Sequence, residues 1–76
     1  MDITVPLLGD VEEVTLVRWL KGVGEDVEAG EAVAEVEADK AIFVIEAPTA
    51  GRIGEVLVPE GAKAKPGAAI ARLEPD

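Results

Sequence analysis

An internal repeat governs how this chain can fold. When the sequence is shifted against itself by 37 positions, residues 24–37 align with residues 61–74. Five aligned pairs are then identical: Gly24/Gly61, Gly30/Gly67, Ala32/Ala69, Ala34/Ala71 and Glu37/Glu74. Apolar character also recurs, at Val33/Ile70, Val36/Leu73, Leu16/Ile53 and Leu20/Leu57. Because the glycines and the apolar positions recur together, we predict two similar halves related by a pseudo-two-fold axis.

Each half is predicted to consist of short strands. Glycine or proline interrupts the chain every few residues and β-branched residues are plentiful, which disfavours helix. The predicted strands cover residues 3–5, 14–20, 32–37, 41–47, 52–58 and 69–73, with short pieces near Val27 and Ala64. The four repeated glycines, Gly24, Gly30, Gly61 and Gly67, are expected at turns that need a positive φ. We therefore predict an all-β fold, a flattened barrel or sandwich of two small sheets.

The sequence does not determine which side of residues 14–20 faces the core, because this stretch is apolar on both faces. Trp19 is expected to be half-buried.

Composition excludes most catalytic chemistry. The chain has 76 residues, enough for a single domain with one thin core. It contains no His, Cys, Ser, Tyr, Asn or Gln, so a Ser or Cys nucleophile and histidine acid–base catalysis are ruled out. The acidic residues are scattered and form no D-x-D-x-D-G calcium loop. We expect neither an enzyme active site nor a metal site within this domain.

The charge limits the possible partners. A formal net charge of −9 argues against nucleic acid and against anionic membrane surfaces, and favours protein partners with basic groups. The sequence has no apolar run of roughly 18 residues, the length of a membrane-spanning helix. Its first residues lack the basic and apolar regions of a signal peptide. A cytoplasmic location is the expectation, or the mitochondrial matrix if the source is eukaryotic.

Residues 35–44 predict a tight hairpin. If Asp39 and Lys40 are its central residues, Ala38 faces Ala41, and the other cross-strand pairs are Glu37–Ile42, Val36–Phe43, Glu35–Val44 and Ala34–Ile45. One face then carries only apolar side chains: Ala34, Val36, Ala38, Ala41, Phe43 and Ile45. A slip of one residue would bury glutamates, so burial sets the register. Lys40 is thereby placed at the tip, facing water. A type I turn is expected, since Asp-Lys lacks the Asn-Gly pattern of primed turns.

Glu37-Ala38-Asp39-Lys40-Ala41 resembles the E-T-D-K-A signature of lipoyl domains from the acyltransferase component of 2-oxo acid dehydrogenase complexes. Other motifs follow in the order of that family: Pro6-Leu7-Leu8-Gly9, Arg18-Trp19-Leu20, Gly24 with Val27 and Gly30, Ala47-Pro48 with Gly51, and Glu60-Gly61. The resemblance covers essentially the whole chain. It implies two four-stranded antiparallel sheets, with the modified lysine and the termini at opposite ends. By the repeat, Asp39 corresponds to Asp76, at the chain end.

The resemblance also implies a function. Lys40 is expected to carry lipoic acid in amide linkage, added by a lipoate-attaching enzyme, with Glu37, Ala38, Asp39 and Ala41 as turn and recognition neighbours. The arm accepts an acyl group from a thiamine-dependent 2-oxo acid decarboxylase and passes it to coenzyme A in an acyltransferase core. Dihydrolipoamide dehydrogenase then reoxidises it. The chain is expected to be the N-terminal domain of a longer acyltransferase, with residues 74–76 as the start of a linker.

Several points depart from the family or stay open. Ala38 replaces the usual threonine. Ile42 and Val44 are expected on the outward face, where the family often has polar residues, and they are either mere strand formers or a contact for the decarboxylase. A biotin carrier is the nearest alternative, but biotin domains flank their lysine with methionines, and Met1 is the only methionine here. An unmodified lipoyl-like docking module is another, in which Lys40 is an ordinary turn lysine. The motifs favour pyruvate or branched-chain complexes over 2-oxoglutarate ones.

Overall fold

The computed structural model describes residues 1–7 and 9–75. Within these residues the chain forms strands and no helix: β1 (Asp2–Thr4), β2 (Val14–Trp19), β3 (Asp26–Val27), β4 (Ala32–Ala38), β5 (Ala41–Glu46), β6 (Gly51–Val56), β7 (Lys63–Ala64) and β8 (Ala69–Glu74). The all-β prediction is confirmed, and every expected strand is present with its ends shifted by at most two residues. Leu8 and Asp76, the latter the expected mate of Asp39, lie outside the described residues.

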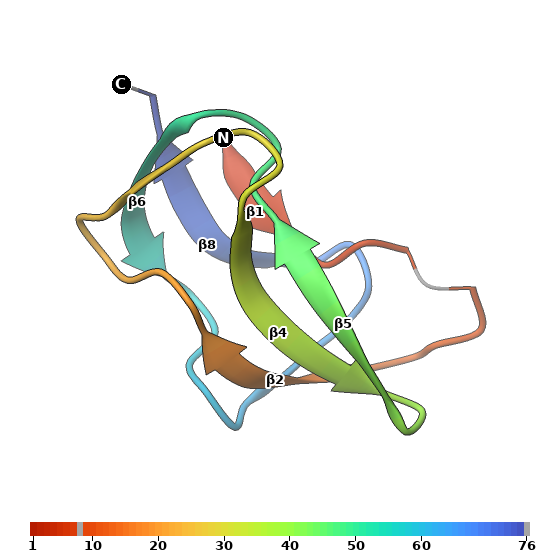
Figure 1. Ribbon diagram of the computed structural model, residues 1–76. Coiled ribbons are helices and arrows are strands. Elements are labelled where there is room, and N and C mark those ends of the chain that lie inside the picture. The colour runs from red at the N-terminus through yellow and green to blue at the C-terminus, as the bar shows by residue number, and fades with distance from the viewer. Residues whose placement is uncertain (8, 76) are drawn as a thin grey trace.

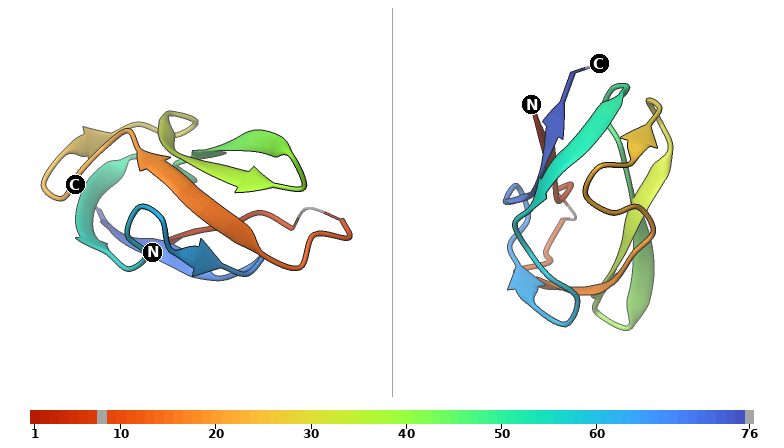
Figure 2. Two further views of the ribbon diagram at one scale, coloured as in Figure 1. Left: turned by 90° about the horizontal axis from the view of Figure 1, so that it is seen from below. Right: turned by 90° about the vertical axis from the view of Figure 1, so that its left-hand side faces the viewer.

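The strands form two four-stranded antiparallel sheets, in the orders β1-β8-β6-β3 and β5-β4-β2-β7. Figures 1 and 2 show the sheets as two facing layers. Ile3, Leu16, Val36, Ile53 and Ile70 are at most 1% exposed and fill the space between the layers. Alternation of apolar and polar residues along each strand turns one face of each sheet toward this shared core. The termini lie at one end of the molecule and the β4–β5 turn at the other (Figure 1).

The repeat is visible in the pairing of the strands. In one sheet Leu16 pairs with Val36, and in the other Ile53 pairs with Leu73. Every pair between β2 and β4 recurs between β6 and β8 when both partners are advanced by 37 positions. The repeated glycines all have φ between 82° and 89°. The predicted pseudo-two-fold relation is therefore confirmed down to individual residue pairs.

The two halves exchange their shortest strands. β3, from the first half, pairs with β6 of the second, and β7, from the second half, pairs with β2 of the first. The pairs Val27–Gly51 and Val14–Ala64 are again related by the same shift. This exchange joins the two halves into one unit, because each sheet contains a short strand from the other half.

A β-bulge settles which side of β2 faces inward. The register shifts between Leu16 and Arg18, so Val17 has no partner on β4. Val14 and Leu16 are buried, whereas Val17 is 44% exposed and Arg18 also faces outward. A bulge redirects the side chains that follow it, which is why simple alternation could not assign this strand. Trp19 is half-buried, as expected, and its Nε1–H donates a hydrogen bond of 2.8 Å to the Val58 carbonyl.

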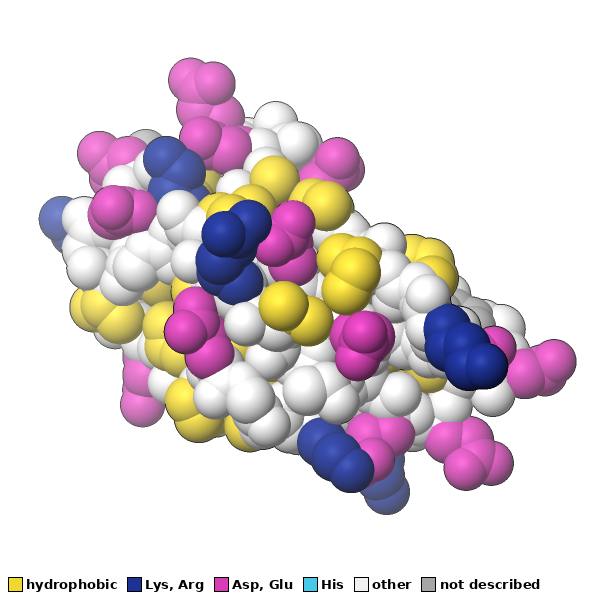
Figure 3. All heavy atoms as spheres, turned by 60° about the horizontal axis from the view of Figure 1, so that its bottom comes forward, with side chains coloured by type: hydrophobic (Ala, Val, Ile, Leu, Met, Phe, Trp, Pro, Cys, Tyr) yellow, Lys and Arg dark blue, Asp and Glu magenta, His cyan; other side chains and the backbone are white. Residues whose placement is uncertain are grey.

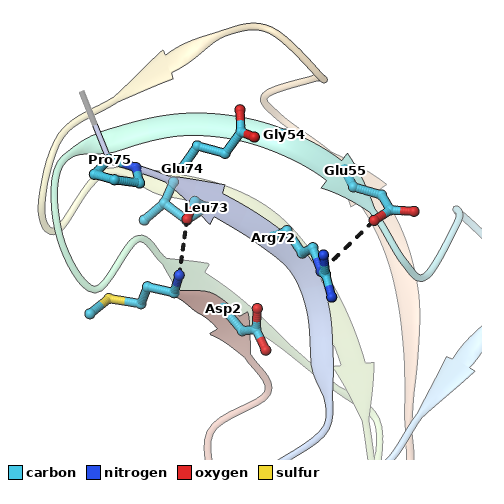
Figure 4. A pocket seen from close by; sticks show the side chains of 8 residues that line it. Asp2, Gly54, Glu55, Arg72, Leu73, Glu74 and Pro75 are labelled. Atoms are coloured by element: carbon cyan, nitrogen blue, oxygen red, sulfur yellow. Dashed lines mark hydrogen bonds and ion pairs between the residues drawn. The ribbon is translucent and has the colours of Figure 1, made fainter.

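Gly51 and Gly54 differ in what lies next to them. A Cβ built on Gly51 would lie 2.4 Å from the Glu74 carbonyl oxygen, which is backbone. A Cβ on Gly54 would meet only the Glu74 side chain, with its nearest atom at 2.7 Å. Figure 4 shows the Glu74 side chain lying along Gly54. A side chain can swing away, but strand β8 cannot move without disturbing its neighbours.

We therefore expect Gly51→Ala to lower the free energy of unfolding by about 2 kcal/mol or more, as overpacking a rigid site does. Gly54→Ala, the matched control, should stay within about 1 kcal/mol of wild type. Urea denaturation followed by the fluorescence of Trp19 measures both. Equal effects at the two positions would contradict the assignment of the clash to the backbone.

Candidate functional site

The β4–β5 hairpin has the register that the sequence predicts. Ala38 pairs with Ala41, and the pairs Glu37–Ile42, Val36–Phe43, Glu35–Val44 and Ala34–Ile45 follow. Ala34, Val36, Ala38 and Ile45 are buried, and Phe43 packs at the margin of the core. Burial of the inward face thus anchors β4 as far as Ala38 and β5 from Phe43 onward. Lys40 is held at the tip by its rigid flanks.

The turn itself differs from the prediction. Asp39 and Lys40 both have positive φ, 49° and 68°. Positive φ at both central residues is the mark of a type I′ turn, so the expected type I turn is wrong. The physical reason is that a type I′ turn matches the right-handed twist of its two strands, whereas a type I turn would splay them. Asp and Lys accept a backbone conformation that residues other than glycine rarely adopt, because the strand pairing requires it.

The structure places the other predicted site residues around this tip. Ala38 is 3% exposed and belongs to the core. Glu37 lies on the outward face of β4, and Asp39 is exposed beside Lys40. Ala41 was expected on the buried face but is exposed. The core ends at Ala38, because the turn extends beyond the opposite sheet and leaves Ala41 nothing to pack against.

An acidic hollow, which the sequence patterns do not predict, lies beside the turn. It has a volume of about 670 Å³ and is lined by Asp10, Val11, Glu12, Glu13 and Asp39. The segment between β1 and β2 brings its three carboxylates to the hairpin. Their position depends on the path of that segment, which carries no periodic pattern. The acidic run after Gly9 was the available signal, but it does not reveal which part of the molecule the run approaches.

Lys40 differs from the other lysines in its surroundings. Lys21 pairs with Glu31 at 3.3 Å and Lys63 with Glu13 at 3.7 Å. Lys40 and Lys65 form no ion pair with any described residue. Of these two, only Lys40 is a central residue of the β4–β5 turn, at the end of the molecule opposite the termini (Figure 1). Its amine is therefore exposed at that end of the molecule and has no ionic partner among the described residues.

A second hollow lies at the opposite end of the molecule, near the termini. Its volume is about 450 Å³, and Figure 4 shows Asp2, Gly54, Arg72 and Glu74 among the residues that line it. The N-terminal ammonium donates a hydrogen bond of 3.2 Å to the Leu73 carbonyl, and Arg72 contacts Glu55 at 3.9 Å. These contacts tie β1 to β8 and β8 to β6. The hollow is too far from Lys40 to form part of the same site.

No group of three or more His, Cys, Asp or Glu side chains within residues 1–7 and 9–75 is arranged to hold a metal ion. The same residues contain no helix long and apolar enough to cross a membrane. The hairpin tip, where the exposed Lys40 lies, is the candidate site.

The positive φ of Asp39 strains the turn for most other side chains. Asp39→Val should lower the free energy of unfolding by about 1–2 kcal/mol, because a β-branched side chain tolerates positive φ poorly. Asp39→Asn should have little effect, since asparagine accepts this conformation. Asp10→Val makes the same chemical change at an exposed residue without positive φ and serves as the control. Urea denaturation compares the three, and an equal loss for both valine variants would show that the turn is not strained.

Comparison with known proteins gives a family and close relatives. The family model described as "Biotin-requiring enzyme" (Biotin_lipoyl) matches residues 1–73. The acetyltransferase component of the pyruvate dehydrogenase complex of Corynebacterium glutamicum is 44% identical over 73 residues, which are 95% of this chain and 11% of that protein. The succinyltransferase component of the 2-oxoglutarate dehydrogenase complex of Staphylococcus saprophyticus is 39% identical over 92% of this chain and 17% of its own length. The chain thus spans less than a fifth of these relatives.

A solved structure shares the fold. The solution structure of the lipoyl domain of the 2-oxoglutarate dehydrogenase complex of Azotobacter vinelandii has a TM-score of 0.76 and 28% sequence identity. The match covers 96% of this chain and 94% of that domain. The likeness therefore extends over nearly the whole of both molecules.

Proposed function

The chain belongs to the family of biotin- and lipoyl-attachment domains, and on that basis we propose that it is a carrier domain with lipoic acid attached to Lys40. The position of Lys40 is the observation that supports this most. Its side chain is exposed, at the tip of a type I′ turn, and makes no ion pair with a described residue. A rigid hairpin carrying a freely accessible amine suits a residue that must enter the active sites of several enzymes in turn.

The names of the relatives favour lipoic acid over biotin. The two relatives compared above are called dihydrolipoyllysine-residue acetyltransferase and dihydrolipoyllysine-residue succinyltransferase components, and the solved neighbour is a lipoyl domain. When bound, a lipoyl group supplies a disulfide that is reduced as it accepts an acyl group and a thiol that passes this group to coenzyme A. Asp39 and Ala41 flank the attachment residue, where a biotin domain would have methionines.

The chain's own contribution is presentation of the arm. Tethering the domain to a large complex gives the arm an effective concentration on the order of millimolar at the active site of each partner. The proposed partners are a lipoate-attaching enzyme, a thiamine-dependent 2-oxo acid decarboxylase, an acyltransferase catalytic core and a dihydrolipoamide dehydrogenase. We further propose that the chain is the N-terminal domain of a longer acyltransferase that acts in the cytoplasm, or in the mitochondrial matrix of a eukaryote. Pyruvate or a branched-chain 2-oxo acid is the proposed substrate of the complex.

The intact mass of the protein purified from its native host tests the proposal. A mass increase of one amide-linked lipoyl group, located on Lys40 by peptide sequencing, is the expected result. An increase matching biotin would make the chain a biotin carrier. An unmodified mass under conditions in which the host's other lipoyl proteins are modified would leave a docking module as the function.

A further inference from the structure

The β4–β5 turn is the covalent link between the two halves of the chain. Strands β1–β4 precede it and strands β5–β8 follow it. Among the described residues, each half contains one strand pair of its own, β2 with β4 or β6 with β8. The other four pairings, β1–β8, β3–β6, β2–β7 and β4–β5, join one half to the other. A second copy of the chain could supply every one of these contacts equally well.

The link itself is strained. Asp39 and Lys40 have φ of 49° and 68°, a conformation that residues with a side chain adopt at a cost. An extended link would relieve both residues, but it would separate the two halves of one chain. No strand pair is lost, however, if each half pairs with the complementary half of another chain. Short hinges under strain favour this kind of exchange.

The register of the hairpin brings opposite charges together in such a dimer. Ala38 pairs with Ala41 in the monomer. In the exchanged dimer this pair forms at both ends of the hinge, each time between two chains. The two hinge segments then run antiparallel, so Asp39 of one chain lies beside Lys40 of the second copy. Opposite charges on neighbouring strands attract each other, whereas Lys40 of the monomer has no ion pair with a described residue.

We propose that the unmodified chain dimerises with a second copy of itself by exchanging halves about the Asp39–Lys40 hinge. Each lobe of the dimer contains β1–β4 of one chain and β5–β8 of the other, around the same core as the monomer. Lys40 then lies in a linker between two lobes and no longer at a tip. The consequence for Lys40 rests on the proposed function: an attaching enzyme that requires the tip should not lipoylate the dimer.

The charge of the chain sets the conditions for the exchange. A net charge of −9 on each copy opposes association at low salt. Figure 3 shows acidic side chains spread over the side of the molecule that carries β2 and the tip of the hairpin. The halves must also separate before they can exchange, so the dimer forms during refolding. We expect it after refolding from urea at millimolar protein concentration in about 1 M salt, where the Debye length is about 3 Å.

The first test compares two substitutions of one hinge residue. Asp39→Gly relieves the strain, because glycine adopts positive φ freely, and Asp39→Val increases it. Both remove the same carboxylate, so the difference between them reports the strain. A left-handed residue is disfavoured roughly tenfold and each dimer has two hinges, so the Asp39→Val dimer should have a Kd at least about 100-fold below that of Asp39→Gly. Asp10→Val, without positive φ, should match the wild type. Size-exclusion chromatography with light scattering measures Kd after refolding over a range of concentrations.

The second test distinguishes exchanged halves from an ordinary dimer. The chain has no cysteine, so Glu35→Cys and Val44→Cys can be placed in separate chains. These two positions face each other across β4 and β5. Refolding the two chains together brings the cysteines opposite each other in the exchanged dimer, and mild oxidation should then link the chains. Glu28→Cys, at an exposed position outside the hairpin, replaces Glu35→Cys in the control and should link far more slowly.

The inference is wrong if the wild-type chain refolds only as a monomer under these conditions, or if the Asp39→Gly and Asp39→Val dimers have equal Kd. It is also wrong if a dimer forms in which the facing cysteines link no faster than the control pair. Lipoylation of the isolated dimer at the rate of the monomer would contradict the consequence for Lys40. A monomer that is never lipoylated would instead contradict the proposed function, and the exchange of halves would still be decided by the two tests above.

Discussion

Lys40→Arg should abolish attachment of the lipoyl group and leave the fold intact. A guanidinium stays protonated in proteins and cannot act as the acyl acceptor that an amine provides. The substitution keeps the positive charge and a flexible side chain at a position that is exposed and free of ion pairs with described residues. The thermal midpoint should therefore stay within about 2 °C of wild type. Intact mass after incubation with the attaching enzyme measures the loss.

Lys65→Arg is the matched control for this experiment. Lys65 is also exposed and also lacks an ion pair with the described residues, but it lies outside the hairpin. This variant should be lipoylated like the wild type. A lipoyl group on Lys21, Lys63 or Lys65 of the wild-type chain would mean that the hairpin does not select the attachment residue.

The register of the hairpin could be predicted because only one pairing buries apolar residues together. Shifting one strand by one position would turn Glu35 or Glu37 toward the core. The relation between the two halves was predictable for a similar reason, since glycines at positive φ and buried apolar residues recur at the same spacing. Both predictions depend on burial, which leaves a clear trace in a sequence.

Features that depend on the third dimension could not be read in this way. The type I′ turn follows from strand twist, a property of the paired strands rather than of Asp39 and Lys40. The side of β2 that faces inward follows from the bulge at Val17, and the equivalent bulge lies at Gly54, a residue of quite different character. The acidic hollow depends on the path of residues 9–13, which no neighbouring pattern determines. At the turn, tertiary geometry overrules the local preference, and at the other two places the local sequence leaves the outcome open.

Exchanging the two central residues of the turn is the sharper test of how Lys40 is presented. Asp39→Lys with Lys40→Asp keeps the composition, the net charge and a turn of two non-glycine residues. Both positions have positive φ in the wild type, so the backbone should keep its shape. The amine, however, moves to position 39, whose side chain lines the hollow with Asp10, Glu12 and Glu13. We expect the new lysine to be drawn toward these carboxylates and away from the tip.

The attaching enzyme should therefore lipoylate the exchanged variant at least about 100-fold more slowly than the wild type. Displacing a reacting group by about 1 Å can lower a reaction rate by this factor. Initial rates of mass increase measure the effect, and unchanged urea denaturation shows that the fold persists.

Adding Glu12→Gln and Glu13→Gln to the exchanged variant separates two causes of a slow rate. Recovery of lipoylation would assign the loss to capture of the amine by the hollow, and no recovery would assign it to the direction of the side chain. Wild-type rates in the exchanged variant itself would show that the enzyme responds to exposure alone, and that the geometry of the turn does not select Lys40.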